Sequence, residues 1–271
     1  MDYIGLCIRD LDEELGAILI FKLSEEGFES FEEKENKLWA FIPESLYHTE
    51  RIHHILKQSG VEADIIHFPE QNWNREWEKN FQPVEISGIC RIRAPFHQPE
   101  PGYRYEIVIE PKMSFGTAHH ETTAMMLELM LAMDFTGKKV LDMGCGTGIL
   151  AILAYKMNAE KIIAVDNDEW AFNNAVENTR KNNADKIDVI FGEIKEIPVD
   201  GFDMILANIT RNLILEQFDD YHRLLNENGG LIVSGFYETD FALIREHALK
   251  SGFHLITFLL KNQWIAAKFG K

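Results

Sequence analysis

The feature that most constrains this chain is the segment VLDMGCGTGILAI, residues 140–152. An apolar run ends at Asp142, glycines occupy alternate positions from Gly144 to Gly148, and a second apolar run begins. Glycines at this spacing permit a tight turn between a strand and a helix, and they let a ligand approach the backbone beside the positive end of the helix. The segment therefore predicts an α/β sheet with a ligand site where its strands end.

The rest of the chain from residue 138 onward alternates between strand-like and helix-like patterns, as an α/β domain requires. The strands expected are residues 139–142, 161–166, 187–191, 202–207, 230–235, 253–260 and 264–269. Helices are expected between the first six, whereas the last two form an antiparallel hairpin. This order predicts the seven-stranded, Rossmann-like sheet of class I methyltransferases better than a six-stranded dinucleotide-binding sheet.

The first 70 residues predict a separate, small α+β domain. Strands are expected at residues 3–8, 28–32, 38–42 and 62–68, and helices at residues 10–23 and 44–59. The resulting β-α-β-β-α-β order is ferredoxin-like. RNA-recognition modules share this topology, and the segment GFESF at residues 27–31 is similar to their aromatic strand, but the surrounding residues are glutamates rather than bases.

Residues 71–80 are expected to form a polar linker helix between this domain and a catalytic domain at residues 81–271. Trp73 and Trp77 are four positions apart and would share one face of that helix. We interpret the pair as an anchor that packs the linker onto a domain.

The charge of the chain disfavours nucleic acid as a partner. The formal net charge is −17, and residues 1–80 carry 18 acidic against 8 basic residues, a net charge of −10. Such a field repels phosphate backbones and attracts basic proteins. With no long apolar run, no signal-peptide pattern and no paired cysteines among Cys7, Cys90 and Cys145, we expect a cytoplasmic monomer without disulfides.

The glycine segment is compatible with two cofactors. Residues 146–151 fit the dinucleotide pattern GxGxxA, but Asp142 directly before the glycines would repel a pyrophosphate and attract a ligand with an ammonium and a sulfonium group. Asp166 ends the second strand, where a carboxylate accepts hydrogen bonds from a ribose diol. Residues 192–194 are expected to border an adenine ring. These features favour S-adenosylmethionine, with Asp168 only capping the next helix.

Two further segments carry polar residues at expected strand or helix ends. Asn208 follows the fourth strand and faces the ligand crevice, unless it is only a turn or cap residue. His119, His120 and Glu121 suggest a metal site, but adjacent histidines point apart and the HExxH pattern is absent, so we expect no metal.

The combination of FGTAHHETT, LDMGCGTGILAI, AVDND and LANI, in this order and spacing, resembles the PrmA family, methyltransferases of ribosomal protein L-eleven of the large subunit. The resemblance covers essentially the whole chain. It implies cofactor contacts at Thr123, Gly144, Asp166 and Asn208, with Gly146 in the same glycine core. The chain departs from the family pattern at Ala118, where many members have glycine, and at Glu121, where many have proline.

The resemblance implies N-methylation of amines in a basic ribosomal protein, either lysine side chains or the N-terminal α-amine, with the small domain recognising the substrate. Asn208 is followed by Ile-Thr-Arg rather than by the Pro-Pro-aromatic sequence common in enzymes that methylate nucleobases or glutamine. A small-molecule methyltransferase would leave residues 1–70 unexplained. A non-catalytic interaction protein would leave the glycine loop unexplained, and a nicotinamide-dependent oxidoreductase fits Asp142 poorly.

Overall fold

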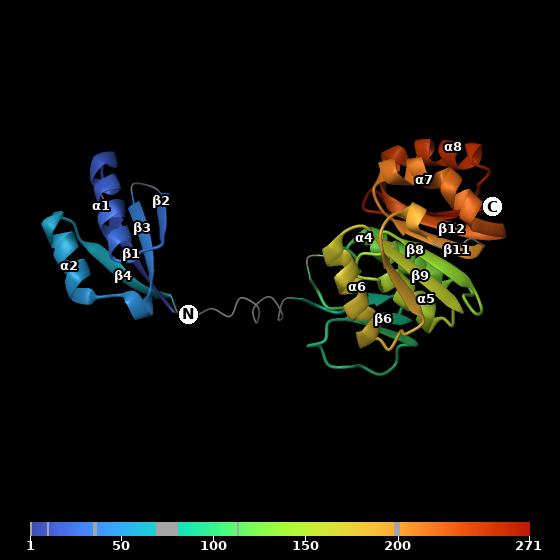
Figure 1. Ribbon diagram of the computed structural model, residues 1–271, viewed down its shortest axis with the longest axis horizontal. Helices are drawn as coiled ribbons and strands as arrows, with labels where there is room; N and C mark the ends of the chain where they lie inside the picture. Colours follow the sequence, from blue (N-terminus) through green and yellow to red (C-terminus); the bar gives the residue numbers. More distant parts are fainter. Residues whose placement is uncertain (1, 10, 35–36, 69–80, 113, 198–200) are drawn as a thin grey trace. The chain divides into compact units, whose positions relative to one another are not determined.

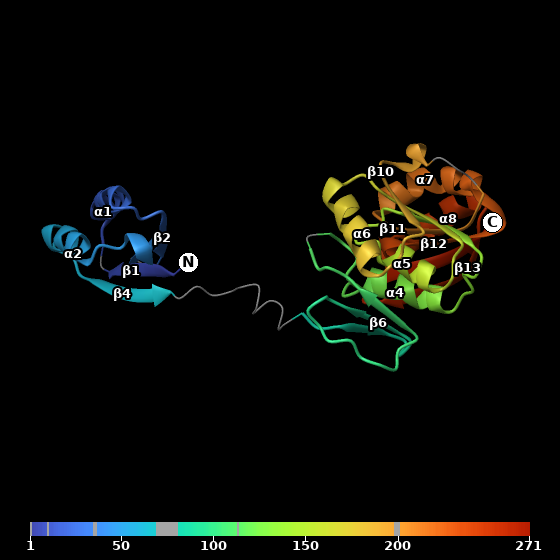
Figure 2. The same ribbon diagram turned by 60° about the horizontal axis from the view of Figure 1, so that its bottom comes forward.

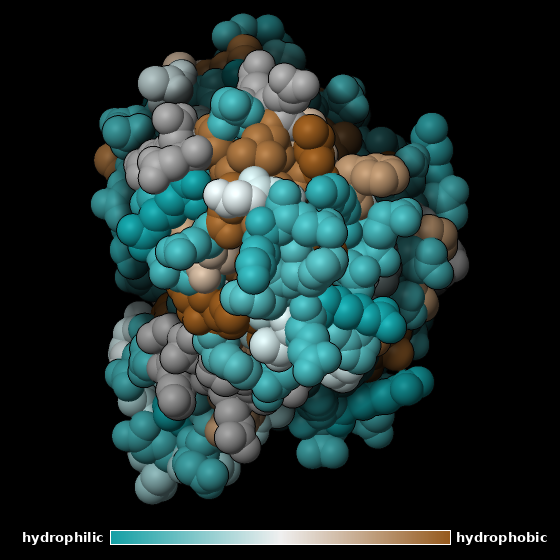
Figure 3. Space-filling model, turned by 90° about the vertical axis from the view of Figure 1, so that its left-hand side faces the viewer, coloured by the Kyte–Doolittle hydropathy of each residue, from teal (hydrophilic) through white to brown (hydrophobic). Residues whose placement is uncertain are grey.

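The computed structural model describes residues 2–9, 11–34, 37–68, 81–112, 114–197 and 201–271 (Figure 1). The chain divides into two compact units, Met1–Asn80 and Phe81–Lys271. The linker helix expected at residues 71–80 lies outside the described residues. Within the described ranges, no helix is long and apolar enough to cross a membrane. Most of the coloured side chains visible in Figure 3 are hydrophilic, with smaller hydrophobic areas between them.

The small unit has the β-α-β-β-α-β order expected from the sequence. Its elements are β1 (Tyr3–Arg9), α1 (Glu13–Glu25), β2 (Ser30–Lys34), β3 (Lys37–Pro43), α2 (Thr49–Gln58) and β4 (Ala63–Phe68). The strands form an antiparallel sheet in the order β2-β3-β1-β4. Asp12 caps α1 by accepting a hydrogen bond from the Leu15 amide at 2.8 Å.

The second helix of the small unit begins later than the sequence predicts. A short 3₁₀ turn, η1 (Glu44–Leu46), follows β3, and Tyr47 and His48 are extended before α2 begins at Thr49. Tyr47 packs against the core of the unit. The prediction of one continuous helix over residues 44–59 is therefore wrong, because tertiary packing of Tyr47 outweighs the helical pattern of the segment.

The two faces of the small sheet differ. Alternate residues of β1 and β3, such as Leu6 and Ala40, are fully buried in a core with side chains of α1 and α2. The opposite face carries Trp39, Phe41 and Phe68, whose rings lie 5.6–6.4 Å apart. The aromatic segment noted in the sequence does not form this face, because Phe28 belongs to the core and Phe31 packs against it.

The large unit contains the seven-stranded sheet predicted from the sequence. Its order is β10-β9-β8-β11-β12-β14-β13, and β14 runs antiparallel to both of its neighbours. The strands are β8 (Lys139–Met143), β9 (Lys161–Asp166), β10 (Ile187–Phe191), β11 (Phe202–Asn208), β12 (Leu225–Tyr237), β13 (His254–Lys261) and β14 (Trp264–Gly270). The chain moves outward in opposite directions from β8 and β11, so ligands are expected beside these two strands.

Helices cover both faces of this sheet (Figures 1 and 2). Helices α4 (Glu121–Leu131), α5 (Ile149–Lys156) and α6 (Glu169–Lys181) share one apolar core with the sheet. Helices α7 (Arg211–Leu224) and α8 (Phe241–Lys250) share the other. Two 3₁₀ turns, η2 (Ile194–Glu196) and η3 (Glu238–Asp240), complete the unit.

A three-stranded sheet precedes α4 and was not predicted from the sequence. It consists of β5 (Val84–Ile86), β6 (Cys90–Arg93) and β7 (Tyr105–Val108), which are too short to show a clear alternation. Two buried asparagines, Asn178 of α6 and Asn182 at its C-terminal cap, hold β7 and the residues after it. Asn182 accepts from the Val108 amide at 2.9 Å and donates to the Val108 carbonyl at 2.7 Å. Asn178 accepts from the Glu110 amide at 2.8 Å.

We predict that Asn182→Ala destabilises the protein by about 2–3 kcal/mol, because both polar groups of Val108 lose a partner in a largely buried setting. The midpoint of urea unfolding measures the change. Asn173→Ala is the matched control, since Asn173 lies exposed on the same helix and its loss is expected to cost less than about 0.5 kcal/mol. Equal effects of the two substitutions would contradict this account of how β7 is held.

Candidate active site

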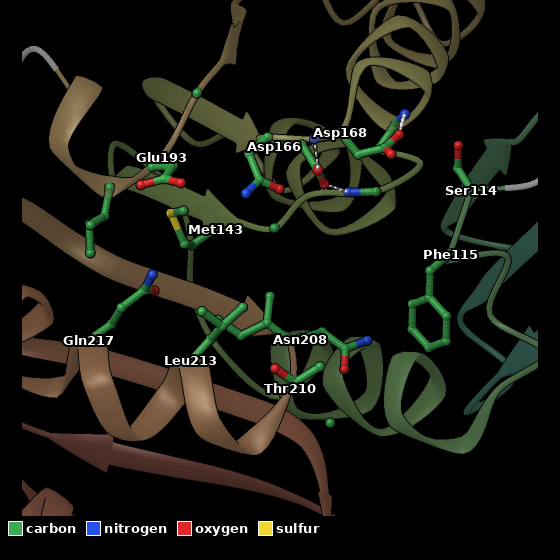
Figure 4. A pocket seen from close by; sticks show the side chains of 18 of the residues that line it. Ser114, Phe115, Met143, Asp166, Asp168, Glu193, Asn208, Thr210, Leu213 and Gln217 are labelled. Atoms are coloured by element: carbon green, nitrogen blue, oxygen red, sulfur yellow. Dashed lines mark hydrogen bonds between the residues drawn. The ribbon is translucent and has the colours of Figure 1, made fainter.

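A cavity of about 1230 Å³ opens where the central strands of the large sheet end. Figure 4 shows Asp166 and Asp168 on one side of it and Asn208 and Thr210 on the other. Glu193 and Gln217 lie toward one end of this view, and Ser114 and Phe115 toward the other. Small-molecule sites usually measure about 300–1,000 Å³. The volume is therefore sufficient for a cofactor together with a side chain of a second substrate.

The glycine loop forms the floor of the cavity and needs glycine for two reasons. Gly144 and Gly146 have φ angles of 68° and 54°, in the left-handed region. A Cβ atom on Gly144 would lie 2.2 Å from the Ile209 side chain, and one on Gly146 would lie 2.4 Å from the Phe115 carbonyl oxygen. Both glycines line the cavity, as the sequence predicts, and α5 begins directly after the loop.

Asp166 lines the cavity at the end of β9. Its Oδ2 accepts a hydrogen bond from the Gly146 amide at 2.8 Å, and its Oδ1 accepts one from the Asp168 amide at 3.0 Å. Each carboxylate oxygen keeps a further lone pair, so the group can also accept hydrogen bonds from a diol. Asp168 caps α6 by accepting from the Ala171 amide at 2.8 Å, which confirms its predicted role.

Asp142 does not have the place that the sequence argument gave it. It lies on the α5 side of β8, is fully buried, and accepts a hydrogen bond from the Ala151 amide at 3.0 Å. Burial raises the pKa of Asp142 to about 7, the Ala151 hydrogen bond opposes this shift, and the nearby Asp166 charge adds to it. Side chains alternate between the two faces of a strand, so Met143 faces the cavity and Asp142 does not. Of these two carboxylates, only that of Asp166 lines the cavity.

Asn208 and Thr123 are brought together from β11 and α4. The Asn208 amide nitrogen donates to the Thr123 hydroxyl at 3.1 Å. Thr123 is only 1% exposed and is not in the cavity wall, whereas Asn208 is. In the part of the chain that the structure describes, the buried Oδ1 of Asn208 has no hydrogen-bond partner. Thr123 thus holds Asn208 in the cavity wall and does not itself line the cavity.

The residues expected beside adenine also line the cavity. Gly192, Glu193 and Ile194 follow β10, and Leu213 of α7 lines the same cavity. The Glu193 amide donates to the Glu196 carboxylate at 2.7 Å, which belongs to a capping box that fixes the η2 turn. A planar ring can therefore be bordered by backbone and by apolar side chains in this part of the cavity.

The structure adds cavity residues that the sequence analysis did not identify. Phe115, His120 and Trp264 line the cavity, with ring centroids 5.2 Å apart between Phe115 and His120 and 4.8 Å apart between His120 and Trp264. Trp264 begins β14, far along the chain, and no local pattern marks it. The prediction that the adjacent histidines point apart is confirmed, because His119 bonds to the Gln82 carbonyl while His120 lines the cavity.

The two departures from the family pattern have local explanations. Ala118 has a φ of 67°, so it adopts the left-handed conformation that a glycine would occupy without strain. Glu121 begins α4, and its carboxylate accepts a hydrogen bond from the Asn262 amide group at 2.9 Å in the β13–β14 turn. This hydrogen bond, followed by one from its own backbone amide, lowers the pKa of Glu121. Among the described residues no group of three or more potential metal ligands occurs.

The strand order, the glycine loop and the carboxylate at the end of β9 together define a class I S-adenosylmethionine-dependent methyltransferase. The model of the PrmA family, ribosomal protein L11 methyltransferase, matches residues 8–271. The chain belongs to this family.

Individual relatives agree with the family match. A ribosomal protein L11 methyltransferase of Porphyromonas gingivalis is 42% identical over 93% of this chain and 89% of its own length. One of Bacteroides fragilis is 40% identical over 97% of this chain and 95% of its own. The crystal structure of a ribosomal protein L11 methylase from Lactobacillus delbrueckii subsp. bulgaricus superimposes with a TM-score of 0.65 and 25% identity, covering 70% of this chain and 98% of that one.

We predict that stability depends on pH through Asp142. Between an ordinary carboxyl pKa near 4 and about 7, the folded protein keeps the Asp142 proton while the unfolded chain has lost it, so wild type loses stability as pH rises through this range. Asp142→Asn does not titrate. Its unfolding free energy relative to wild type should therefore rise from pH 5.5 to about 7, by roughly 2 kcal/mol, and level off above. Urea unfolding at a series of pH values measures the difference, and a difference independent of pH would contradict the assignment.

Proposed function

We propose that this protein methylates amino groups of a large-subunit ribosomal protein, ribosomal protein L11, on lysine side chains, the N-terminal α-amine or both. The names of the relatives support the substrate, and the strongly acidic small unit supports a basic partner. The observation that carries the proposal is the position of Asn208, which Thr123 holds in the wall of a cavity large enough for a cofactor and a side chain. A small-molecule substrate would leave the small unit without a role.

The residues of the cavity fit S-adenosylmethionine. The backbone of Gly144 and Gly146 would border its methionine part, Asp166 the ribose hydroxyls, and residues 192–194 the adenine. A side chain on Gly146 would clash with the Phe115 carbonyl, so the loop keeps its conformation only with glycine at this position. When bound, this cofactor supplies an electrophilic methyl group on a sulfonium.

The target amine must be neutral to accept a methyl group. A lysine with a pKa near 10.4 pays about 4–5 kcal/mol for losing its proton at neutral pH, whereas an α-amine with a pKa near 8 pays about 1 kcal/mol. Transfer into a cavity away from water lowers either cost. No residue pattern in the sequence marks a general base, so we propose that the proton leaves to solvent before attack.

Asn208 would orient the amine. Its Nδ2 donates to the Thr123 hydroxyl, and its side-chain or backbone oxygen would accept a hydrogen bond from an amine N–H and so direct the nitrogen lone pair toward the methyl group. An asparagine oxygen accepts without taking the proton, which matches a role in orientation rather than in general base catalysis.

We predict that Asn208→Ala lowers kcat/KM for methyl transfer by about 10- to 100-fold, which corresponds to about 1–3 kcal/mol for one hydrogen bond in a closed site. Transfer of labelled methyl groups from S-adenosylmethionine to ribosomal protein L11 measures the effect. Asn173→Ala, on the exposed side of α6, serves as the control and should leave the rate unchanged. Unchanged turnover of Asn208→Ala would remove the orienting role.

We propose that the small unit recognises the protein substrate. Its net charge attracts a basic partner and repels phosphate, and the sheet face with Trp39, Phe41 and Phe68 adds aromatic surface that α1 and α2 do not cover. Phe68 is 39% exposed, so this face is accessible within the unit. Recognition at a site separate from the cavity lets substrate selection and methyl transfer use different residues.

We predict that the large unit alone, residues 81–271, still binds S-adenosylmethionine but no longer modifies intact ribosomal protein L11, because its cavity residues are all retained and the acidic unit is lost. Calorimetry with the cofactor and mass spectrometry of the ribosomal protein measure the two effects. Association of the full chain with the substrate should weaken with salt, since exposed charges are screened over about 8 Å at physiological ionic strength. Full modification by the truncated enzyme would refute the recognition role.

A further inference from the structure

We propose that His119 is a positioning residue that ties the loop beside the cofactor site, residues 114–120, to Phe81 and Gln82 at the start of the large unit. The proposal rests on the cofactor site described above. The side chain of His119 does not line the cavity, whereas that of the next residue, His120, does.

His119 contacts both of these residues. Its ring centroid lies 4.5 Å from that of Phe81, and its Nε2 lies 3.0 Å from the Gln82 carbonyl oxygen. A carbonyl only accepts, so Nε2 donates. In the neutral ring Nδ1 then accepts from the Thr117 hydroxyl at 3.2 Å, which turns one imidazole into a link between the loop and residues 81–82.

Phe81 is itself held in place by a second histidine. His97 stacks on Phe81 with centroids 6.2 Å apart, and its Nε2 lies 2.7 Å from the Phe81 carbonyl oxygen. The Ala94 amide donates to His97 Nδ1 at 3.1 Å, so Nε2 carries the proton and donates to Phe81. The start of the large unit is therefore a fixed point to which His119 can attach.

The other side of the same loop meets the glycine loop. The Phe115 carbonyl accepts from the Thr147 amide at 2.9 Å, and the Gly116 carbonyl accepts from the Thr147 hydroxyl at 2.6 Å. His120, the residue after His119, lines the cavity. Gly116 and Ala118 have positive φ angles, so the segment is neither helix nor strand and depends on such contacts for its position.

The consequence is that cofactor binding depends on the first two residues of the large unit. His119 contacts Phe81 and Gln82, and the next residue in the chain, His120, lines the cofactor cavity. His119 acts through the loop and not by touching the ligand. Its loss should therefore weaken cofactor binding more than it slows the transfer step.

The test uses the full-length protein and S-adenosylmethionine. We expect His119→Ala and Phe81→Ala each to raise the dissociation constant from calorimetry about five- to tenfold, and the KM for the cofactor by a similar factor, with kcat within twofold of wild type. The double variant should lose less affinity than the product of the two single losses, because both substitutions remove the contact between the His119 and Phe81 rings. His119→Gln, whose amide can donate to the Gln82 carbonyl, should recover part of the affinity.

Ile232→Val is the control for stability, since Ile232 is fully buried in the sheet core and does not line the cavity. It should lower the unfolding temperature and leave cofactor affinity unchanged. The proposal is overturned if wild type binds the cofactor and His119→Ala binds it within twofold, if the two losses multiply, or if Ile232→Val weakens binding equally. Failure of wild type to bind S-adenosylmethionine would instead refute the cofactor site itself.

Discussion

The hydrogen bond from the Gly146 amide to Asp166 joins the two features on which the site depends. It links the loop after β8 to the end of β9, so the glycine turn and the carboxylate are positioned by each other. The turn is possible only because Gly144 and Gly146 leave no Cβ atom against Ile209 and Phe115. A backbone amide satisfied by a carboxylate in this way also fixes a negative charge beside the cavity, where a cationic ligand is favoured over a pyrophosphate.

Thr147 connects the glycine loop to α6 and to the segment before α4. The Thr147 carbonyl accepts from Asn178, while its amide and hydroxyl bond to the segment at Phe115 and Gly116. The segment between β7 and α4 is irregular, and its backbone polar groups still need hydrogen-bond partners. Side chains such as those of Thr147 and Asn178 supply some of these hydrogen bonds, which strand pairing supplies in a sheet. The cavity wall is consequently assembled from pieces that are distant in the chain but directly bonded to one another.

In the proposed function, the two units of the chain would serve two different physical requirements. Long-range attraction of a basic protein needs many exposed acidic groups, and the small unit carries an excess of them. Methyl transfer needs a few groups at fixed distances, and the proposed site would use Asn208 and Asp166 at the ends of strands, with Asn208 held by Thr123 of α4. A surface that attracts through charge can tolerate motion, whereas the transfer site cannot.

The sequence by itself determined the sheet, the glycine loop and the places of Asp166, Asp168 and Asn208, because strand alternation, turn glycines and helix caps are local patterns. It missed the three-stranded sheet at residues 84–108, the late start of α2 and the burial of Asp142. It also did not predict that Trp264 lines the cavity or that His119 contacts Phe81. Only the tertiary structure decided these, since each depends on packing between segments far apart in the chain, and local residue preferences carry no information about such partners.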